Sequence, residues 1–291
     1  MAFSEVVNVT GTPQLTLETG GSDAVVDYSS GTGSNTLTFN YTIGSGETSS
    51  DLDYKATSSL ALNGGTIKDA ALNNATLTLA SPGATNSLGD NKALIVDTTV
   101  PTVTNVTSTT GDGSYKQGET IAITVAFSEV VNVTGTPQLT LETGGSDAVV
   151  DYSSGTGSNT LTFNYTIGSG ETSSDLDYKA TSSLALNGGT IKDAALNNAT
   201  LTLASPGATN SLGDNKALIV DTSVPTISSV SLNSANSELT VTFAEGVYDT
   251  DGGSGDLEAA DFELSISGGV ATVASTPTGI SKTAQNIWVL D

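Results

Sequence analysis

The chain of 291 residues contains no cysteine, no histidine and no arginine, and only one tryptophan. Without cysteine, disulfides are excluded as the means of holding the fold together. Without histidine or cysteine, a nucleophile and its base would have to come from lysine or carboxylates, and no serine lies in a G-x-S-x-G context. A pair of carboxylates can serve a glycosidase, but every acidic cluster here lies in a predicted turn. The sequence therefore predicts a protein that is not an enzyme.

Positive charge is scarce as well. The chain has 31 acidic and 8 basic residues, all of the latter lysines, and a formal net charge of −23. Single, scattered lysines give no basic patch for nucleic acid or for an anionic membrane surface. No apolar run approaches the ~18 residues of a membrane span, and the start "MAFSEVVNV" lacks the features of a signal peptide. Nucleic acid and a membrane span are thus not expected among the partners.

What the chain has in quantity is threonine alternating with apolar residues in short runs, the pattern of β-strands. The clearest predicted strands are 119–127, 137–143, 159–167, 199–205 and 216–221, and the weaker ones are 102–106, 147–152 and 179–186. Glycine-rich turns such as "ETGGSD" and "SSGTGSN" separate them, and "KDAALNNA" (192–199) is predicted as a loop. Short strands with a turn every 8–12 residues predict an all-β, immunoglobulin-like antiparallel β-sandwich.

The sequence also repeats itself. Residues 2–98 recur unchanged at 126–222, and a third, diverged start follows, in which "TVTFAEGV" (240–247) matches "TVAFSEVV" (124–131). A period of 124 residues, from position 2 to position 126, is too long for a solenoid unit. We therefore expect tandem domains at 1–99 (truncated at its N-terminus), 100–223 (complete) and 224–291 (truncated at its C-terminus). The chain would then be a piece of a longer tandem protein.

Several stretches resemble a known family. "VDTTVPTVTNV", "GETIAITVAFSEVVNVTG", "GGTIKDAALNNATLTL" and "LIVDTSVP" are similar to the bacterial Ig-like (Big-type) tandem repeats of large secreted and surface adhesins. The resemblance implies an extracellular location at a bacterial surface, with neighbouring repeats as partners. It also implies a role as stalk, spacer or binder. The family commonly has a glycine where this chain has Leu72 and Leu196, so its tight turn is not expected there.

Calcium is the metal that this composition favours, because hard cations prefer several oxygen ligands. The candidates in the first repeat are Asp51, Asp53, Asp69 and Asp97, and those in the second are Asp175, Asp177, Asp193 and Asp221. Counting strands back from the "VDTT" segment, with "SGETSSDLDY" (45–54) predicted as a loop, places each set at the pole that faces the next domain. Glu129 and Glu245, from the following repeats, then point back to the same joints. Unpaired like charges are costly together unless a cation lies among them.

A second candidate is the stretch "YDTDGGSGDLEAADF" (248–262), in which Asp249 and Asp251 have the D-x-D start of a calcium loop. It lacks the spacing of an EF-hand, so a long polar hairpin loop is the competing interpretation. The same holds for every aspartate taken singly, since each can be a solvated Asx-turn or strand-end residue.

Two hypotheses about function follow. The first is a structural extender, stiffened by calcium at its joints, that projects a distal adhesive domain towards a host or surface glycan or protein. The second is an Ig-like module of a secreted protein whose own loops bind glycan or protein.

Overall fold

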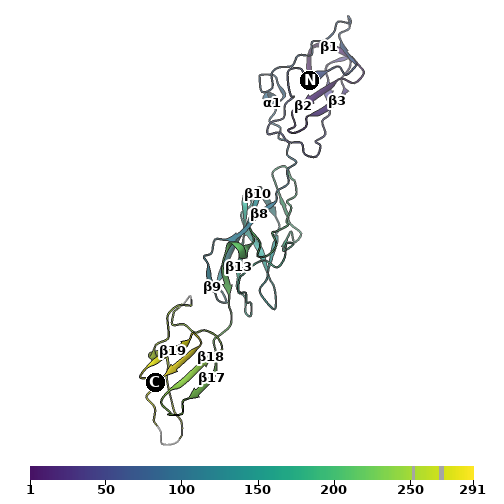
Figure 1. Ribbon diagram of the computed structural model, residues 1–291. Coiled ribbons are helices and arrows are strands. Elements are labelled where there is room, and N and C mark those ends of the chain that lie inside the picture. The colour runs from purple at the N-terminus through teal and green to yellow at the C-terminus, as the bar shows by residue number, and fades with distance from the viewer. Residues whose placement is uncertain (251–252, 269–271) are drawn as a thin grey trace. The chain divides into compact units, whose positions relative to one another are not determined.

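The computed structural model describes residues 1–250, 253–268 and 272–291 (Figure 1). Strands predominate, and nearly all of them pair antiparallel. The chain divides into two compact units: unit 1 contains Met1–Pro101 with Lys192–Ala199, and unit 2 contains Thr102–Ile191 with Thr200–Asp291. The all-β class predicted from the alternating pattern is confirmed. The predicted division into three domains stays a prediction.

Unit 1 contains two antiparallel sheets that share one core. The strand orders are β4-β1-β7 and β5-β3-β2-β6. Their bounds are β1 Ala2–Thr10, β2 Gln14–Leu17, β3 Ala24–Ser30, β4 Ser34–Thr36, β5 Thr38–Phe39, β6 Leu60–Ala61 and β7 Thr66–Lys68. Val7 and Ile67 of the first sheet are buried in the same cluster as Leu15 and Val26 of the second. Burial of these apolar side chains is the main stabilising contribution that the two sheets share.

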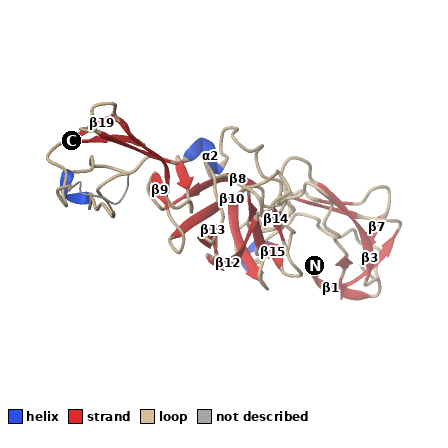
Figure 2. Cartoon of the chain, turned by 90° about the horizontal axis from the view of Figure 1, so that it is seen from below, coloured by secondary structure: helices blue, strands red, loops and turns tan. Residues whose placement is uncertain are grey.

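Unit 2 is built on a larger sheet with the order β14-β11-β12-β13-β10-β15, to which β8 is added by pairing with β10. The bounds are β8 Val103–Ser108, β10 Thr120–Thr134, β11 Gln138–Leu141, β12 Ala148–Ser154, β13 Ser158–Thr166, β14 Leu184–Ala185 and β15 Thr190–Lys192. Figure 2 shows β10, β12 and β13 side by side. Along β10 the side chains of Ile121, Ile123 and Val125 are fully buried, and the residues between them are less so, as the period of two requires.

The remaining elements of unit 2 are smaller. Strands β16 (Leu218–Val220) and β9 (Gly113–Tyr115) form a parallel pair, and a four-stranded sheet has the order β17-β18-β20-β19. The strands of that sheet are β17 Ile227–Leu232, β18 Leu239–Phe243, β19 Ile280–Ala284 and β20 Ile287–Leu290. Single helical turns complete the described chain: α1 (Leu88–Asn91) in unit 1, and α2 (Leu212–Asn215) and η1 (Ala259–Asp261) in unit 2.

The two identical sequence copies differ in how deeply they are buried. Ile43 is 52% exposed and its counterpart Ile167 only 2%, and Leu94 is 42% exposed where Leu218 is 0% exposed. In the second copy β9 pairs with β16, and Glu119 accepts a hydrogen bond from the Ile167 N–H at 2.9 Å. These partners belong to residues 101–125, which precede the second copy. Residues that are identical in sequence are therefore buried where that segment packs against them and exposed where it does not.

Three expectations about local structure are wrong. Residues 199–205 were predicted as a strand, but only an isolated bridge joins Thr200 to Thr102. The "SSDLDY" segment was predicted as a loop, yet Ser49 bridges Val96 in an antiparallel pairing. The tight turn not expected at Leu72 and Leu196 is present, because both adopt a left-handed conformation with φ of 67° and 72°. Both leucines are largely exposed, so the turn occurs at the cost of backbone strain rather than by a glycine.

Candidate metal site

The strand count from the sequence placed Asp51 and Asp53 at the pole of Asp97, and the pairing in unit 1 shows that this placement is wrong. Ser49 is bonded to Val96, next to Asp97 in the chain. From there the segment runs antiparallel to 94–96, with Leu52 N–H donating to the Leu94 carbonyl at 2.7 Å. Asp53 is therefore carried away from Asp97, towards the loop before α1.

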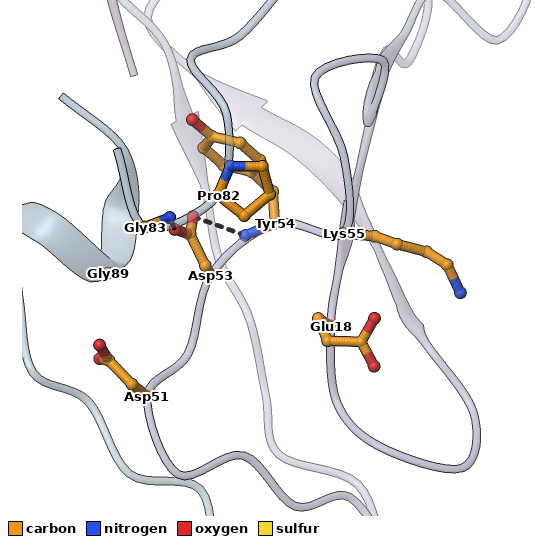
Figure 3. Close-up of a pocket in the computed structure, with 8 residues that line it drawn as sticks. All are labelled: Glu18, Asp51, Asp53, Tyr54, Lys55, Pro82, Gly83 and Gly89. Atoms are coloured by element: carbon orange, nitrogen blue, oxygen red, sulfur yellow. Dashed lines mark hydrogen bonds between the residues drawn. The ribbon is translucent and has the colours of Figure 1, made fainter. Parts of the chain in front are cut away.

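Asp53 serves that loop as a hydrogen-bond acceptor (Figure 3). Its carboxylate accepts backbone N–H groups from Gly83 at 3.0 Å, Leu88 at 3.1 Å and Tyr54 at 2.8 Å. Burial acts to raise the pKa of Asp53, but the hydrogen bonds from Gly83, Ser87 and the neighbouring backbone outweigh it and hold this pKa below the ordinary value. The carboxylate thus holds the loop before α1 together through three backbone hydrogen bonds.

The second copy repeats this arrangement with Asp177, which accepts the N–H of Gly207 at 2.9 Å and that of Tyr178 at 2.8 Å. Its neighbour Asp175 is exposed at the surface. Desolvation, and then the charge of Asp177, raise the pKa of Asp175. These two aspartates are therefore a structural acceptor and its like-charged neighbour, placed by the same antiparallel pairing between Ser173 and Val220.

Asp97 and Asp193 are the two predicted ligands that unit 1 brings together. A carboxylate oxygen of Asp97 lies within 4.8 Å of one of Asp193. Asp193 follows β15, is only 2% exposed, and belongs to the Lys192–Ala199 segment that unit 1 includes. Two oxygens at about 2.4 Å from one calcium ion lie up to about 4.8 Å apart. The spacing therefore fits a shared divalent cation.

Asn197 organises this pair. Its backbone N–H donates to Asp193 Oδ1 at 2.8 Å and its side-chain Nδ2 donates to Asp193 Oδ2 at 2.7 Å. The same Nδ2 also reaches the backbone carbonyls of Asp97 at 3.0 Å and Thr99 at 3.1 Å. Asp97 is held in turn by its own Asx turn, in which Thr99 N–H donates to Oδ1 at 2.9 Å. Both carboxylates are therefore held in place by hydrogen bonds from backbone and side-chain N–H groups.

The first copy contains the same loop. Asp69 accepts the backbone and side-chain N–H groups of Asn73, each at 2.8 Å, and these bonds hold the pKa of Asp69 below its ordinary value. Asp69, Asn73 and Glu5 line one cavity of about 330 Å³ in unit 1. Because the copies are identical in sequence, Glu5 and Asp69 are the counterparts of Glu129 and Asp193. Glu129 itself lies partly buried in β10.

The other predicted ligands are not gathered in this way. Asp221 is exposed and its Oδ1 accepts the Ser223 N–H at 2.8 Å in an Asx turn like that of Asp97. Glu245 is partly buried just after β18. Within residues 1–250, 253–268 and 272–291, neither belongs to a group of three acidic side chains able to share an ion.

Of the separate candidate loop, Asp249 is exposed and its N–H donates to the Gly255 carbonyl at 3.4 Å. Asp251 lies outside the described residues. Among the described residues of this stretch, Thr250 bridges Ser254 in an antiparallel pairing.

Sequence reasoning missed Asn197, which contributes more bonds to the site than any carboxylate. The signal was in the double asparagine of "DAALNN", which was interpreted only as a loop marker. Asparagine four residues after an aspartate can bond that aspartate through both backbone and side chain once the intervening residue adopts a left-handed conformation.

No family model, no curated protein and no solved structure matches the chain. In the part of the chain that the structure describes, no helix has the length and apolar character needed to span a membrane.

Proposed function

We propose that this chain is a stretch of tandem immunoglobulin-like β-sandwich repeats that act as a structural extender of a bacterial surface adhesin, with calcium bound where one repeat joins the next. The repeats are proposed to have no catalytic role and to face the extracellular medium. Exact duplication of residues 2–98 supports this, because an extender gains length by repeating an identical unit.

The observation that carries the proposal is the pairing of Asp97 with Asp193. Asp97 ends the first repeat, whereas Asp193 lies 67 residues into the second copy (126–222) and is nevertheless part of unit 1. Two carboxylates at this distance repel one another, and one of them is almost fully buried. A divalent cation between them removes the repulsion and ties the end of one repeat to a loop of the next.

Glu129 is the third proposed ligand. The basis is its counterpart Glu5, which lines the same cavity as Asp69 in the first copy. Three carboxylates supply part of the six to eight oxygens that calcium takes, and water supplies the rest. An affinity of roughly 10⁻⁴–10⁻³ M, as in other extracellular modules, is expected.

The test is thermal unfolding of the full chain during a calcium titration, followed by excess EDTA. Calcium is expected to raise the melting temperature, and Asp193→Asn is expected to abolish that increase. Asp69→Asn is the matched control, because Asp69 has the same neighbours in sequence but no counterpart of Asp97 beside it. A calcium effect that is absent, or lost equally in both variants, contradicts the proposal.

A glycan array with the full chain tests the second hypothesis, a module that binds glycan or protein through its own loops. Binding of a glycan that survives EDTA would favour that hypothesis over the extender.

A further inference from the structure

Strands β12 and β13 run together at one end only. In the described chain β13 pairs with β12 through Tyr152 and Ser154, whereas residues 148–151 of β12 pair with β11, on the opposite edge. Between the diverging strands lies a groove of about 690 Å³, lined by residues 147–153, 164–166 and Glu171. Because consecutive residues of two strands line it, the groove follows strand edges, all of them within unit 2.

The groove side of β12 is an open strand edge. The Tyr152 N–H donates to the Pro137 carbonyl at 2.8 Å, on the side of β11. Successive residues of an antiparallel strand direct their N–H and C=O groups to opposite edges, so Val149 directs both of its groups to the groove. No strand of the described chain pairs with this edge at Val149. Such an edge is a template for a further strand, and the addition of an extended peptide is a recurrent mode of recognition.

The side chains along this edge are apolar and acidic in turn. Val149 is 57% exposed, and Asp151, two residues later on the same face, is exposed as well. Asp151 accepts the amide of Gln138 at 2.9 Å, a neutral donor that leaves the negative charge in place. Glu171, which also lines the groove, accepts the neutral hydroxyl of Tyr165 at 2.7 Å.

The opposite end of the edge differs in charge, because Asp147 there pairs with Lys179. The groove therefore offers an apolar position at Val149 and a negative position at Asp151. A second copy of this chain is a poor occupant, since its net charge of −23 opposes association with an acidic surface. Complementary charge favours a basic segment of another protein.

We propose that the groove binds an extended, basic segment of another protein, which adds to β12 as a further antiparallel strand. The segment exchanges two backbone hydrogen bonds with Val149, and its residue opposite Val149 is apolar. Two residues before that position, a lysine or arginine of the segment lies opposite Asp151. This inference goes beyond the proposed extender and depends neither on it nor on calcium.

The experiment adds the full chain, in EDTA, to a fluorescently labelled heptapeptide of threonines with a central valine and a lysine two residues before it, and measures anisotropy. The copies are identical in sequence, so Asp27 is changed together with Asp151. Asp27→Asn with Asp151→Asn is expected to weaken binding about threefold, the effect of one exposed cross-strand ion pair. Asp90→Asn with Asp214→Asn removes the same charge from exposed aspartates outside the groove and should leave the affinity unchanged. Absence of binding at millimolar peptide, or equal effects of the two double variants, overturns the proposal.

Two methylated peptides test the strand addition itself. Methylation of the valine amide nitrogen removes a bond to Val149 and is expected to weaken binding at least about fivefold. Methylation of the next amide nitrogen, which points away from β12, should be tolerated and is the matched control. If both methylated peptides bind as tightly as the parent peptide, charge alone holds the peptide and the added strand is excluded.

Discussion

The side-chain amide of Asn197 donates to the backbone carbonyl of Asp97, 100 residues earlier in the chain, at 3.0 Å. This bond places a loop of the second repeat in the same compact unit as the end of the first. It fixes the approach of Asp97 to Asp193 by a contact that does not depend on an ion. We call the segment 97–99 the seam. Two features meet at it: the Asn197 amide, which orients the segment, and the carboxylates of Asp97 and Asp193, which a cation can join.

Replacing Asn197 by alanine is expected to lower the free energy of unfolding by about 1–2 kcal/mol, since two bonds to seam carbonyls are lost. The measurement is urea unfolding of the full chain in EDTA. Asn73→Ala removes the same side chain where no seam is bound and is expected to have a smaller effect. Equal losses in the two variants would mean that the bonds to the seam contribute nothing.

Replacing Asp53 by alanine is expected to destabilise the protein by about 1–3 kcal/mol, because the buried N–H of Tyr54 and those of Gly83 and Leu88 lose their acceptor. The loss should be the same with and without calcium. Asp51→Ala, which removes an exposed carboxylate two residues away, should change stability much less. A calcium-dependent loss for Asp53→Ala would show that this carboxylate binds the ion after all.

Asp175→Asn is expected to raise the melting temperature at pH 7. Partial desolvation and the charge of Asp177 raise the pKa of Asp175 above its ordinary value of 3.8, so the ionised form is less favourable in the folded state. The wild type therefore loses stability relative to the variant as the pH rises through that range, and at pH 3 the gain should disappear. A gain that is constant from pH 3 to pH 7 would exclude the ionisation as its cause.

Leu196→Gly is expected to stabilise the chain by about 1 kcal/mol. Leu196 is 70% exposed and has a φ of 72°, a conformation that costs a leucine roughly 1–2 kcal/mol and costs glycine little. Leu72→Gly, at φ 67°, should behave alike, and the double variant should be additive in chemical denaturation. Leu186→Gly, at a leucine that is 37% exposed and has no left-handed φ, is the control and should destabilise.

Much of the fold follows from local pattern. The alternation in Ile121, Ile123 and Val125 predicted β10, and its threonine-rich neighbours predicted β11, β12 and β13. The "ATLTLAS" run has the same alternation but forms only a bridge, because a strand also requires a partner with free backbone groups, and that partner is tertiary information. Ile43 and Ile167 show the same limit, since one sequence gives two degrees of burial.

The candidate site was predictable in part. The repeat and the strand count predicted that Asp97 lies at the end of its repeat and that Asp193 is a candidate calcium ligand. The count failed at Asp51 and Asp53 because it treated a paired segment as a loop, which moved two residues to the wrong pole. Asn197 was missed although the double asparagine of "DAALNN" signalled it, since its role depends on a left-handed Leu196 that the sequence argued against.

The most direct test of the account is an anomalous difference map from crystals of the full chain grown in millimolar calcium. The account predicts a peak within about 2.3–2.6 Å of a carboxylate oxygen of both Asp97 and Asp193, and no such peak in crystals of Asp193→Asn. A well-ordered seam with no peak between these two carboxylates would contradict it.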